Sequence, residues 1–299
     1  MLSLHTNAAA LSAQNSIGRT QSGLSTSMTR LSTGFRINSA MDDAAGLQIA
    51  TRLKTQTSGM GVAMRNTQNS ISMLQTAEGA LDETTNILNR MKDLATQAAD
   101  GSSTLADQTA MQAEFNSLSD ELSNIFGNTK FGGTTLFQDT NGTLTTALSF
   151  QIGADKSETM SVNFGTEVTA AKTKILAAAT GFVATGAAGT AGGTEISHAT
   201  VAATGSANAN ATIQDLADSI DAVGALRSKL GAISNRLDHV FNNLSNISTN
   251  TKNATGRIMD VDFASESANM TSKQMLLQAG TAMLKQSNSQ SSLVLSLLQ

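Results

Sequence analysis

The 299-residue chain contains no cysteine, proline, tryptophan or tyrosine, and its aromatic residues, all phenylalanine, make up only 3% of it. Without cysteine, the protein has neither a disulfide framework nor a thiol nucleophile. Without proline, long helices lack the residue that most strongly interrupts them. Because few aromatic side chains leave a lean core, we expect association with partner chains to supply part of the stability.

Charge and hydropathy argue against binding to nucleic acid or insertion into a membrane. The formal net charge is −4, and the 19 lysines and arginines are scattered along the chain, whereas a phosphate-binding surface needs a concentrated basic face. No apolar run approaches the roughly 18 residues of a membrane span. The first residues have neither the basic start nor the apolar stretch of a secretory signal, so we expect no cleavable signal.

The sequence has no residue spacing typical of a catalytic, nucleotide or metal site. Its three histidines are far apart and form no His-Glu-x-x-His motif. Asp260 and Asp262 resemble the start of a calcium loop. However, Ser265 and Thr271 stand where that loop needs glycine and glutamate. The glycines of residues 186–193 precede no Gly-Lys-Ser/Thr. We therefore expect no enzyme, no metal and no cofactor.

The strongest pattern is a helix over residues 44–98, whose apolar residues form two neighbouring stripes with spacings of four and three. A two-stranded coiled coil needs only one stripe, so this helix needs at least two partners, and we expect an elongated bundle. The first stripe is Met60, Met64, Thr67, Ile71, Leu74, Leu81 and Leu88, and the second is Met73, Ala77, Ala80, Ile87, Met91, Leu94 and Ala98.

Polar residues before this helix predict how it begins. Ser39 followed by Asp42 resembles a capping box, and Asp42 and Asp43 both suit the positive end of a helix dipole. Arg36 is a candidate ion-pair partner for these carboxylates. Paired carboxylates can also act as general acid and base, but no histidine or nucleophile lies nearby in the sequence, so we favour the structural role.

The middle of the chain changes its periodicity. Spacings of four and three predict a third helix over residues 111–125. Residues 134–137, 144–152 and 160–164 then indicate short strands. The Asn-Gly step at 141–142 favours a tight turn that joins the first two strands into a hairpin.

Two contrasting segments follow the strands. Residues 166–211 are rich in Ala, Gly and Thr and predict a weakly specified outer region. Thr212 followed by Asp215 predicts the capped start of another helix. That helix carries the most regular seam of the chain: Leu226, Leu230, Ile233, Leu237, Val240, Leu244, Ile247, Thr251, Ala254 and Ile258.

Both ends of the chain carry helical seams with few strong anchors. We expect residues 7–29 to be helical only when packed, because small and polar residues dominate them. The apolar residues of 293–298 spread around the helix, so one partner helix cannot cover them all. The N-terminal seam is Leu4, Ala8, Leu11, Leu24, Met28, Leu31 and Phe35; the C-terminal stripes are Leu276, Ala279, Met283, Leu293 and Leu297, and Leu277, Gly280, Leu284, Val294 and Leu298.

These patterns predict a mainly α fold: a long antiparallel helical bundle or coiled coil formed by the N- and C-terminal regions, with a small β-hairpin region and a short outer insertion. We expect three domains. A terminal coiled-coil domain comprises residues 1–42 and 259–299, a helical bundle domain with the hairpin comprises 43–165 and 212–258, and the outer region comprises 166–211.

Three stretches carry a resemblance to bacterial flagellins. LSTGFRINSAMDDAAGLQIATRL, residues 31–53, resembles their N-terminal signature. GRIMDVDFASE, residues 256–266, is similar to the motif that opens their C-terminal helix, and FQIGADKSETMSV, residues 150–162, is similar to strands of their core. The resemblance covers about residues 1–165 and 212–299.

The resemblance implies a structural subunit that polymerises into the flagellar filament and is secreted, unfolded, through the flagellar export channel. Implied partners are other copies of the chain, a secretion chaperone, the filament cap and the hook-junction proteins. We assign self-assembly to Leu4, Leu11, Leu24, Met28, Leu31, Phe35, Arg36, Asn38, Asp42, Asp43, Leu276, Met283, Leu293, Val294, Leu297 and Leu298.

Residues 88–95 are similar to the flagellin segment that an innate immune receptor of animals recognises. The resemblance assigns recognition to Arg90 and Leu94, with Glu114 on the next helix as a third contact. In the alternative interpretation, Leu94 belongs to the bundle core and Arg90 to a solvated face.

Two other functions compete with the filament subunit. A hook-filament junction protein would share coiled terminal helices, but the signatures at 31–53 and 150–162 favour the filament subunit. A flagellin with a protease in its outer region is the enzymatic alternative, and the missing His-Glu-x-x-His motif argues against it.

Overall fold

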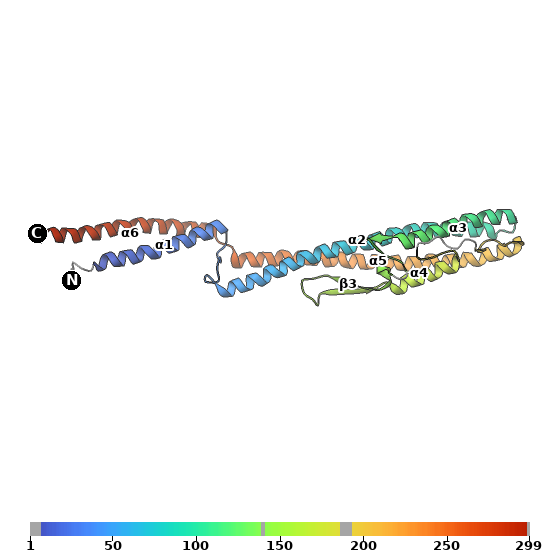
Figure 1. Ribbon diagram of the computed structural model, residues 1–299, viewed down its shortest axis with the longest axis horizontal. Coiled ribbons are helices and arrows are strands. Elements are labelled where there is room, and N and C mark those ends of the chain that lie inside the picture. The colour runs from blue at the N-terminus through green and yellow to red at the C-terminus, as the bar shows by residue number, and fades with distance from the viewer. Residues whose placement is uncertain (1–6, 139–140, 186–192, 298–299) are drawn as a thin grey trace. The chain divides into compact units, whose positions relative to one another are not determined.

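The computed structural model describes residues 7–138, 141–185 and 193–297, with side chains described up to residue 289. It confirms a mainly helical fold (Figure 1). The helices are α1 (Ala8–Thr33), α2 (Ala44–Ala99), α3 (Leu105–Asn128), α4 (Gly165–Ala178), α5 (Ala202–Met259) and α6 (Phe263–Leu297). The strands are β1 (Lys130–Phe131), β2 (Thr134–Thr135), β3 (Ala147–Gln151) and β4 (Thr159–Asn163), with a 3-10 turn η1 (Thr143–Thr145).

The chain divides into two compact units, which we call the terminal unit, Met1–Thr57 with Ser248–Gln299, and the bundle unit, Ser58–Ile247. The terminal domain predicted from the sequence, residues 1–42 and 259–299, falls within the terminal unit. Its boundaries, and those of the other predicted domains, stay a prediction.

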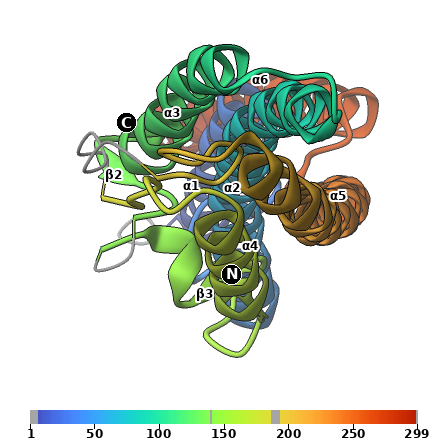
Figure 2. The ribbon, with the colours of Figure 1, turned by 90° about the vertical axis from the view of Figure 1, so that its right-hand side faces the viewer.

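In the bundle unit, α2 packs against neighbours on both of its apolar stripes, as predicted. Leu74, Leu81 and Leu88 of the first stripe are fully buried, and so are Ala77 and Met91 of the second. Figure 2 shows α3, α4 and α5 around this part of α2. Each buried leucine stabilises the fold by about 1.5–3 kcal/mol. Both stripes of α2 belong to the hydrophobic core of the bundle unit, so α2 contributes a large part of its stability.

The strands form two hairpins, and the predicted pairing of residues 134–137 with 144–152 is wrong. β2 pairs with β1, and β3 pairs antiparallel with β4. Gly132 and Gly133 have φ of 58° and 87°, a left-handed backbone that suits glycine, so the β1–β2 turn forms there. Residues 139–140 of the predicted turn lie outside the described residues.

The segment predicted to be a weakly specified outer region contributes to the core, which corrects that prediction. Val168, Ala171 and Ile175 of α4 are fully buried, as is Ile196. Lys229 of α5 holds α4 by an ion pair of 2.7 Å to Glu167. Hydrogen bonding to this ammonium lowers the pKa of the Glu167 carboxyl.

A buried glutamine holds the second part of this segment. The Gln112 amide on α3 donates to the Glu195 carboxylate (2.8 Å) and accepts from the Ile196 N–H (2.8 Å). Thr212 donates its hydroxyl to the Glu195 carbonyl (2.8 Å) from within α5. The predicted capped start at Thr212 and Asp215 is therefore wrong, because α5 begins at Ala202.

The terminal unit pairs α1 and α6 antiparallel (Figure 1). Small and polar residues set the register of this pair. Ile17 packs against Gly280, where a Cβ would come within 2.9 Å of it. The Lys273 ammonium donates to the Gly23 carbonyl (3.1 Å) and the Ser27 hydroxyl (2.8 Å). These contacts specify one alignment but bury little apolar surface.

Limited proteolysis of the dissociated subunit is expected to remove the ends first, before about Asn38 and after about Arg257. The reason is that Leu24, Ile37 and Ala50 are the buried apolar residues among the described part of the terminal unit, while the bundle unit has a continuous core. Mass spectrometry of the early fragments measures the order of cleavage. Early cuts within residues 60–88 would contradict the prediction.

Candidate functional site

The outward faces of α1 and α6 carry large apolar side chains in contact with solvent. Leu11 and Met28 on α1 are 55% and 57% exposed, and Leu276 and Met283 on α6 are 59% and 69% exposed. A helix pair that leaves such residues uncovered presents a surface suited to a protein partner. We call these four residues the outer apolar face.

The predicted N-terminal seam mixes two faces of α1, which the structure separates. Leu24 is buried and Leu31 is partly buried, whereas Leu11 and Met28 face solvent. Beside them lie partly or fully buried residues that, apart from Ile17, are small or polar and carry no strong apolar signal in the sequence. They are Ala10, Ala13, Ile17, Thr20 and Ser27.

The two predicted stripes of the last helix also have different surroundings. Leu277, Gly280 and Leu284 are partly buried, and Leu276 and Met283 are exposed. Leu4 and Leu298, assigned to self-assembly, lie outside the described residues. The backbone at 293–297 is part of α6, but the side chains of Leu293, Val294 and Leu297 lie outside the described part.

Two short segments join the terminal helices to α2 and α5 and are hydrogen-bonded to each other. Gly34 has φ of 75° and ends α1 in a left-handed turn. The Arg36 N–H donates to the Met259 carbonyl (2.6 Å), and the Val261 N–H donates to the Gly34 carbonyl (3.0 Å). Phe35 is 43% exposed beside this bridge. The bridge fixes the end of α1 against the start of α6.

Arg36 does not pair with Asp42, which corrects the predicted ion pair. Its guanidinium donates to the Ile258 carbonyl at 2.9 Å. Asp42 instead accepts from the N–H groups of Asn38 (3.1 Å) and Ser39 (2.9 Å) and lies 3.5 Å from the Arg30 guanidinium. The two backbone hydrogen bonds and this cation lower the pKa of the Asp42 carboxyl. Asp42 thus organises the turn before α2.

Asp43, rather than Ser39 with Asp42, caps α2. Its carboxylate accepts a hydrogen bond of 2.8 Å from the N–H of Gly46, which lies three residues after Asp43. This is the geometry of a helix N-cap. Asn38 donates its side-chain amide to the Phe35 carbonyl at 2.7 Å and so closes the preceding turn. The predicted capping box is wrong because Asp42 is engaged with the turn itself.

The predicted recognition residues lie on α2 and α3 of the bundle unit. The Arg90 guanidinium donates twice to the Glu114 carboxylate, at 2.9 and 2.7 Å, and the two side chains are 54% and 46% exposed. Leu94 is only 3% exposed and belongs to the core. The structure therefore brings Arg90 and Glu114 together at the surface and places Leu94 beneath it.

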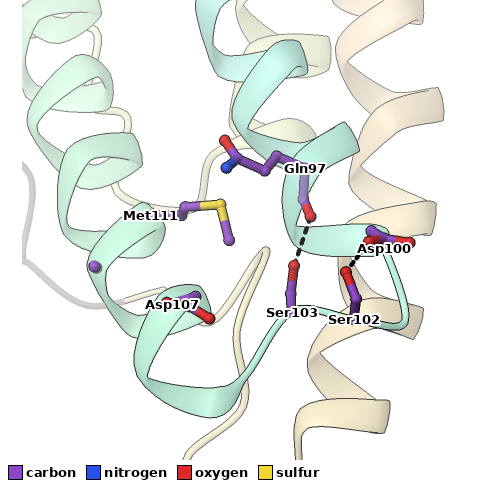
Figure 3. Close-up of a pocket in the computed structure, with 7 residues that line it drawn as sticks. Gln97, Asp100, Ser102, Ser103, Asp107 and Met111 are labelled. Atoms are coloured by element: carbon purple, nitrogen blue, oxygen red, sulfur yellow. Dashed lines mark hydrogen bonds between the residues drawn. The ribbon is translucent and has the colours of Figure 1, made fainter.

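An open pocket of about 440 Å³ lies at the turn between α2 and α3. Gln97 and Met111 lie toward each other across it (Figure 3). The Ser103 hydroxyl donates to the Gln97 carbonyl at 2.8 Å, and hydrogen bonds from Thr104 lower the pKa of the Asp107 carboxyl. Asp107 and Thr104 form a capping box for α3. The polar groups around the pocket therefore stabilise the turn between α2 and α3.

Within the described ranges, no group of three or more His, Cys, Asp or Glu residues is placed to hold a metal ion. No helix in the described part of the chain is long and apolar enough to cross a membrane.

Comparison with known proteins connects these helices to one family. Residues 4–142 match the bacterial flagellin N-terminal helical region, and residues 213–298 match the bacterial flagellin C-terminal helical region. Polar flagellin B/D of Vibrio parahaemolyticus is 52% identical over 157 residues, which are 52% of this chain and 40% of that protein. Flagellin C of Vibrio cholerae is 51% identical over 162 residues, 54% of this chain and 42% of that protein. The match thus spans less than half the length of these curated relatives.

Two solved structures are also similar. The crystal structure of Bacillus cereus flagellin has 30% identity and a TM-score of 0.46, covering 60% of this chain and 88% of its own. A Vibrio parahaemolyticus protein described as flagellar hook-associated has 18% identity and a TM-score of 0.55, covering 73% of this chain and 100% of its own; this second likeness shows a shared fold. Because both helical regions of one family match, the chain belongs to the bacterial flagellin family.

Proposed function

We propose that this chain is a structural subunit that polymerises with its own copies into the filament of a bacterial flagellum. The outer apolar face carries the proposal, because it places large exposed side chains on the two helices at the ends of the family-matched regions. Burial of such side chains between subunits would be repeated at every step of growth.

The proposal includes the route to the filament. The subunit leaves the cell unfolded through the flagellar export channel, aided by a secretion chaperone, and folds where it joins the filament beneath the cap, outside the cell. The α1–α6 pair, held by small and polar contacts, is the part whose order depends most on neighbouring chains.

Electron microscopy of the purified protein tests this function. After heating and cooling with short filament fragments as seeds, the chain is expected to form long, regular filaments. The alternative, a hook-filament junction protein, has the fold of the hook-associated structure. Such a protein would bind to the ends of the seeds, and the seeds would not elongate. Absence of elongation across a range of concentrations would therefore remove the filament proposal.

Recognition by an animal innate immune receptor is a second proposed property, supported by the exposed pair of Arg90 and Glu114. Replacing both with alanine is expected to reduce receptor signalling several-fold, because it removes two charged groups from one surface. Filament formation should continue, since exposed ion pairs contribute about 0–1 kcal/mol to stability. A reporter-cell assay measures signalling, with Lys174→Ala/Asp218→Ala, another exposed pair, as the control. Equal signalling from wild type and the Arg90 and Glu114 variant would exclude these residues.

A further inference from the structure

The methionines of the two units differ in exposure, although Met259 and Met270 of the terminal unit are partly buried. Among the described residues, four methionines are exposed, and all four lie in the terminal unit. Met28 is 57% exposed on α1, and Met275 and Met283 are 60% and 69% exposed on α6. Met41, in the turn before α2, is 97% exposed. These thioether sulfurs are therefore accessible to small oxidants in the single subunit.

The methionines of the bundle unit are protected by comparison. Met91 is fully buried, and Met60, Met111 and Met160 are 3–8% exposed. The remaining two, Met64 and Met73, are partly buried. Because oxidation requires contact between the sulfur and the oxidant, a limited dose of peroxide should modify the terminal unit and spare the bundle core.

We propose that Met28, Met275 and Met283 are oxidation sites at which a peroxide, acting on the unassembled subunit, stops filament growth. The sulfur attacks one peroxide oxygen and the O–O bond breaks. The thioether is oxidised by two electrons to the sulfoxide, and hydrogen peroxide is reduced to water. An apolar, flexible side chain thereby becomes polar.

The inference rests on the proposed function, in which copies of the chain cover the outward faces of α1 and α6. The three methionines are exposed on these helices, as are Leu11 and Leu276. A sulfoxide buried among apolar side chains there would lose its contact with water, and burial of a polar group costs free energy when no hydrogen bond replaces that contact. Methionines already buried in a filament are shielded from the oxidant, so free subunits are more sensitive than finished filaments.

Hydrogen peroxide treatment of the purified subunit, followed by seeded growth, tests the inference. Peptide mass spectrometry is expected to find one added oxygen at the four exposed methionines and none at Met60, Met91, Met111 or Met160. The concentration needed for growth should rise roughly tenfold or more. Incubation with methionine sulfoxide reductases should restore growth. Filaments treated in the same way should remain unmodified at Met28, Met275 and Met283.

Variants separate the three sites from general damage. Met28→Leu/Met275→Leu/Met283→Leu keeps apolar side chains and is expected to grow equally before and after peroxide, whereas Met41→Leu should remain as sensitive as wild type. Normal growth of wild-type subunits oxidised at all three sites would overturn the inference, as would failure of the reductases to restore growth. If untreated wild-type protein does not grow, the proposed function fails instead. In that case the mass spectra still show which methionines of the single subunit the peroxide reaches.

Discussion

Leu276→Asp/Met283→Asp is expected to abolish filament growth while the bundle unit unfolds at the wild-type temperature. Both side chains are more than half exposed on α6 and make no part of the bundle core. Burial of two such side chains between subunits is worth about 3–6 kcal/mol, which corresponds to more than a hundredfold in the concentration needed for growth. A buried, unpaired carboxylate adds a further cost.

The matched control is Leu176→Asp on α4. Leu176 is 50% exposed, so the substitution has the same chemistry and similar exposure but lies in the bundle unit and outside the residues assigned to self-assembly. The protein concentration that Leu176→Asp needs for filament growth should stay within a few-fold of the wild-type value. Sedimentation and electron microscopy measure polymer, and calorimetry measures the thermal transition. Normal filaments from the double variant would show that α6 does not use this face for assembly.

The long helices could be predicted because large apolar residues mark their buried positions. Leu74, Leu81 and Leu88 on α2 follow the helical period closely, and burial of that stripe dominates any competing local preference. The inward face of α1 could not be found in this way. Its contacts with α6 include Ile17 against Gly280 and the Gly23 carbonyl with Lys273. Glycines and isolated apolar residues are recognised as contacts only when the partner helix is known to approach closely.

The segment after β4 differs from its prediction for a related reason. Its first part packs through buried residues of α4, and its second part is held by the buried Gln112 amide, which comes from a helix about 80 residues earlier in the chain. Likewise, the Asn-Gly step at 141–142 is a strong local signal, yet Gly132 and Gly133 form the hairpin turn. Tertiary contacts decide between such local alternatives, and periodicity does not report them.

The candidate site was only partly visible in the sequence. Spacing places Leu276 and Met283 on one helical stripe, the resemblance implies their role in assembly, and the structure shows that they are exposed. Their assignment to intersubunit contacts stays a prediction. The cap at Asp43 was less visible, because two adjacent carboxylates precede α2 and only the geometry distinguishes the N-cap from the turn residue Asp42.

Phe126→Ala is expected to lower the free energy of unfolding of the bundle unit by about 3–5 kcal/mol, the range found when a buried phenylalanine is truncated. Phe126 on α3 is fully buried. Its ring lies 5.3 Å from the Phe137 ring and 5.4 Å from the Phe182 ring, the latter edge-on. Phe126 therefore connects α3 to two loop segments, the one after β2 that contains Phe137 and the one after α4 that contains Phe182. Such a loss corresponds to a decrease in Tm of about 10 °C for a unit of this size.

Two further variants separate buried volume from ring contacts. Phe126→Leu keeps most of the apolar volume but loses the edge-on contact, which adds about 0.5–1.5 kcal/mol, so its stability should fall between wild type and Phe126→Ala. Phe263→Ala, at a ring that is 58% exposed in the terminal unit, should leave this transition unchanged. Urea unfolding followed by circular dichroism measures all three. A Phe126→Ala protein within about 1 kcal/mol of wild type would mean that the neighbouring side chains collapse into the cavity and that Phe137 and Phe182 hold these segments without it.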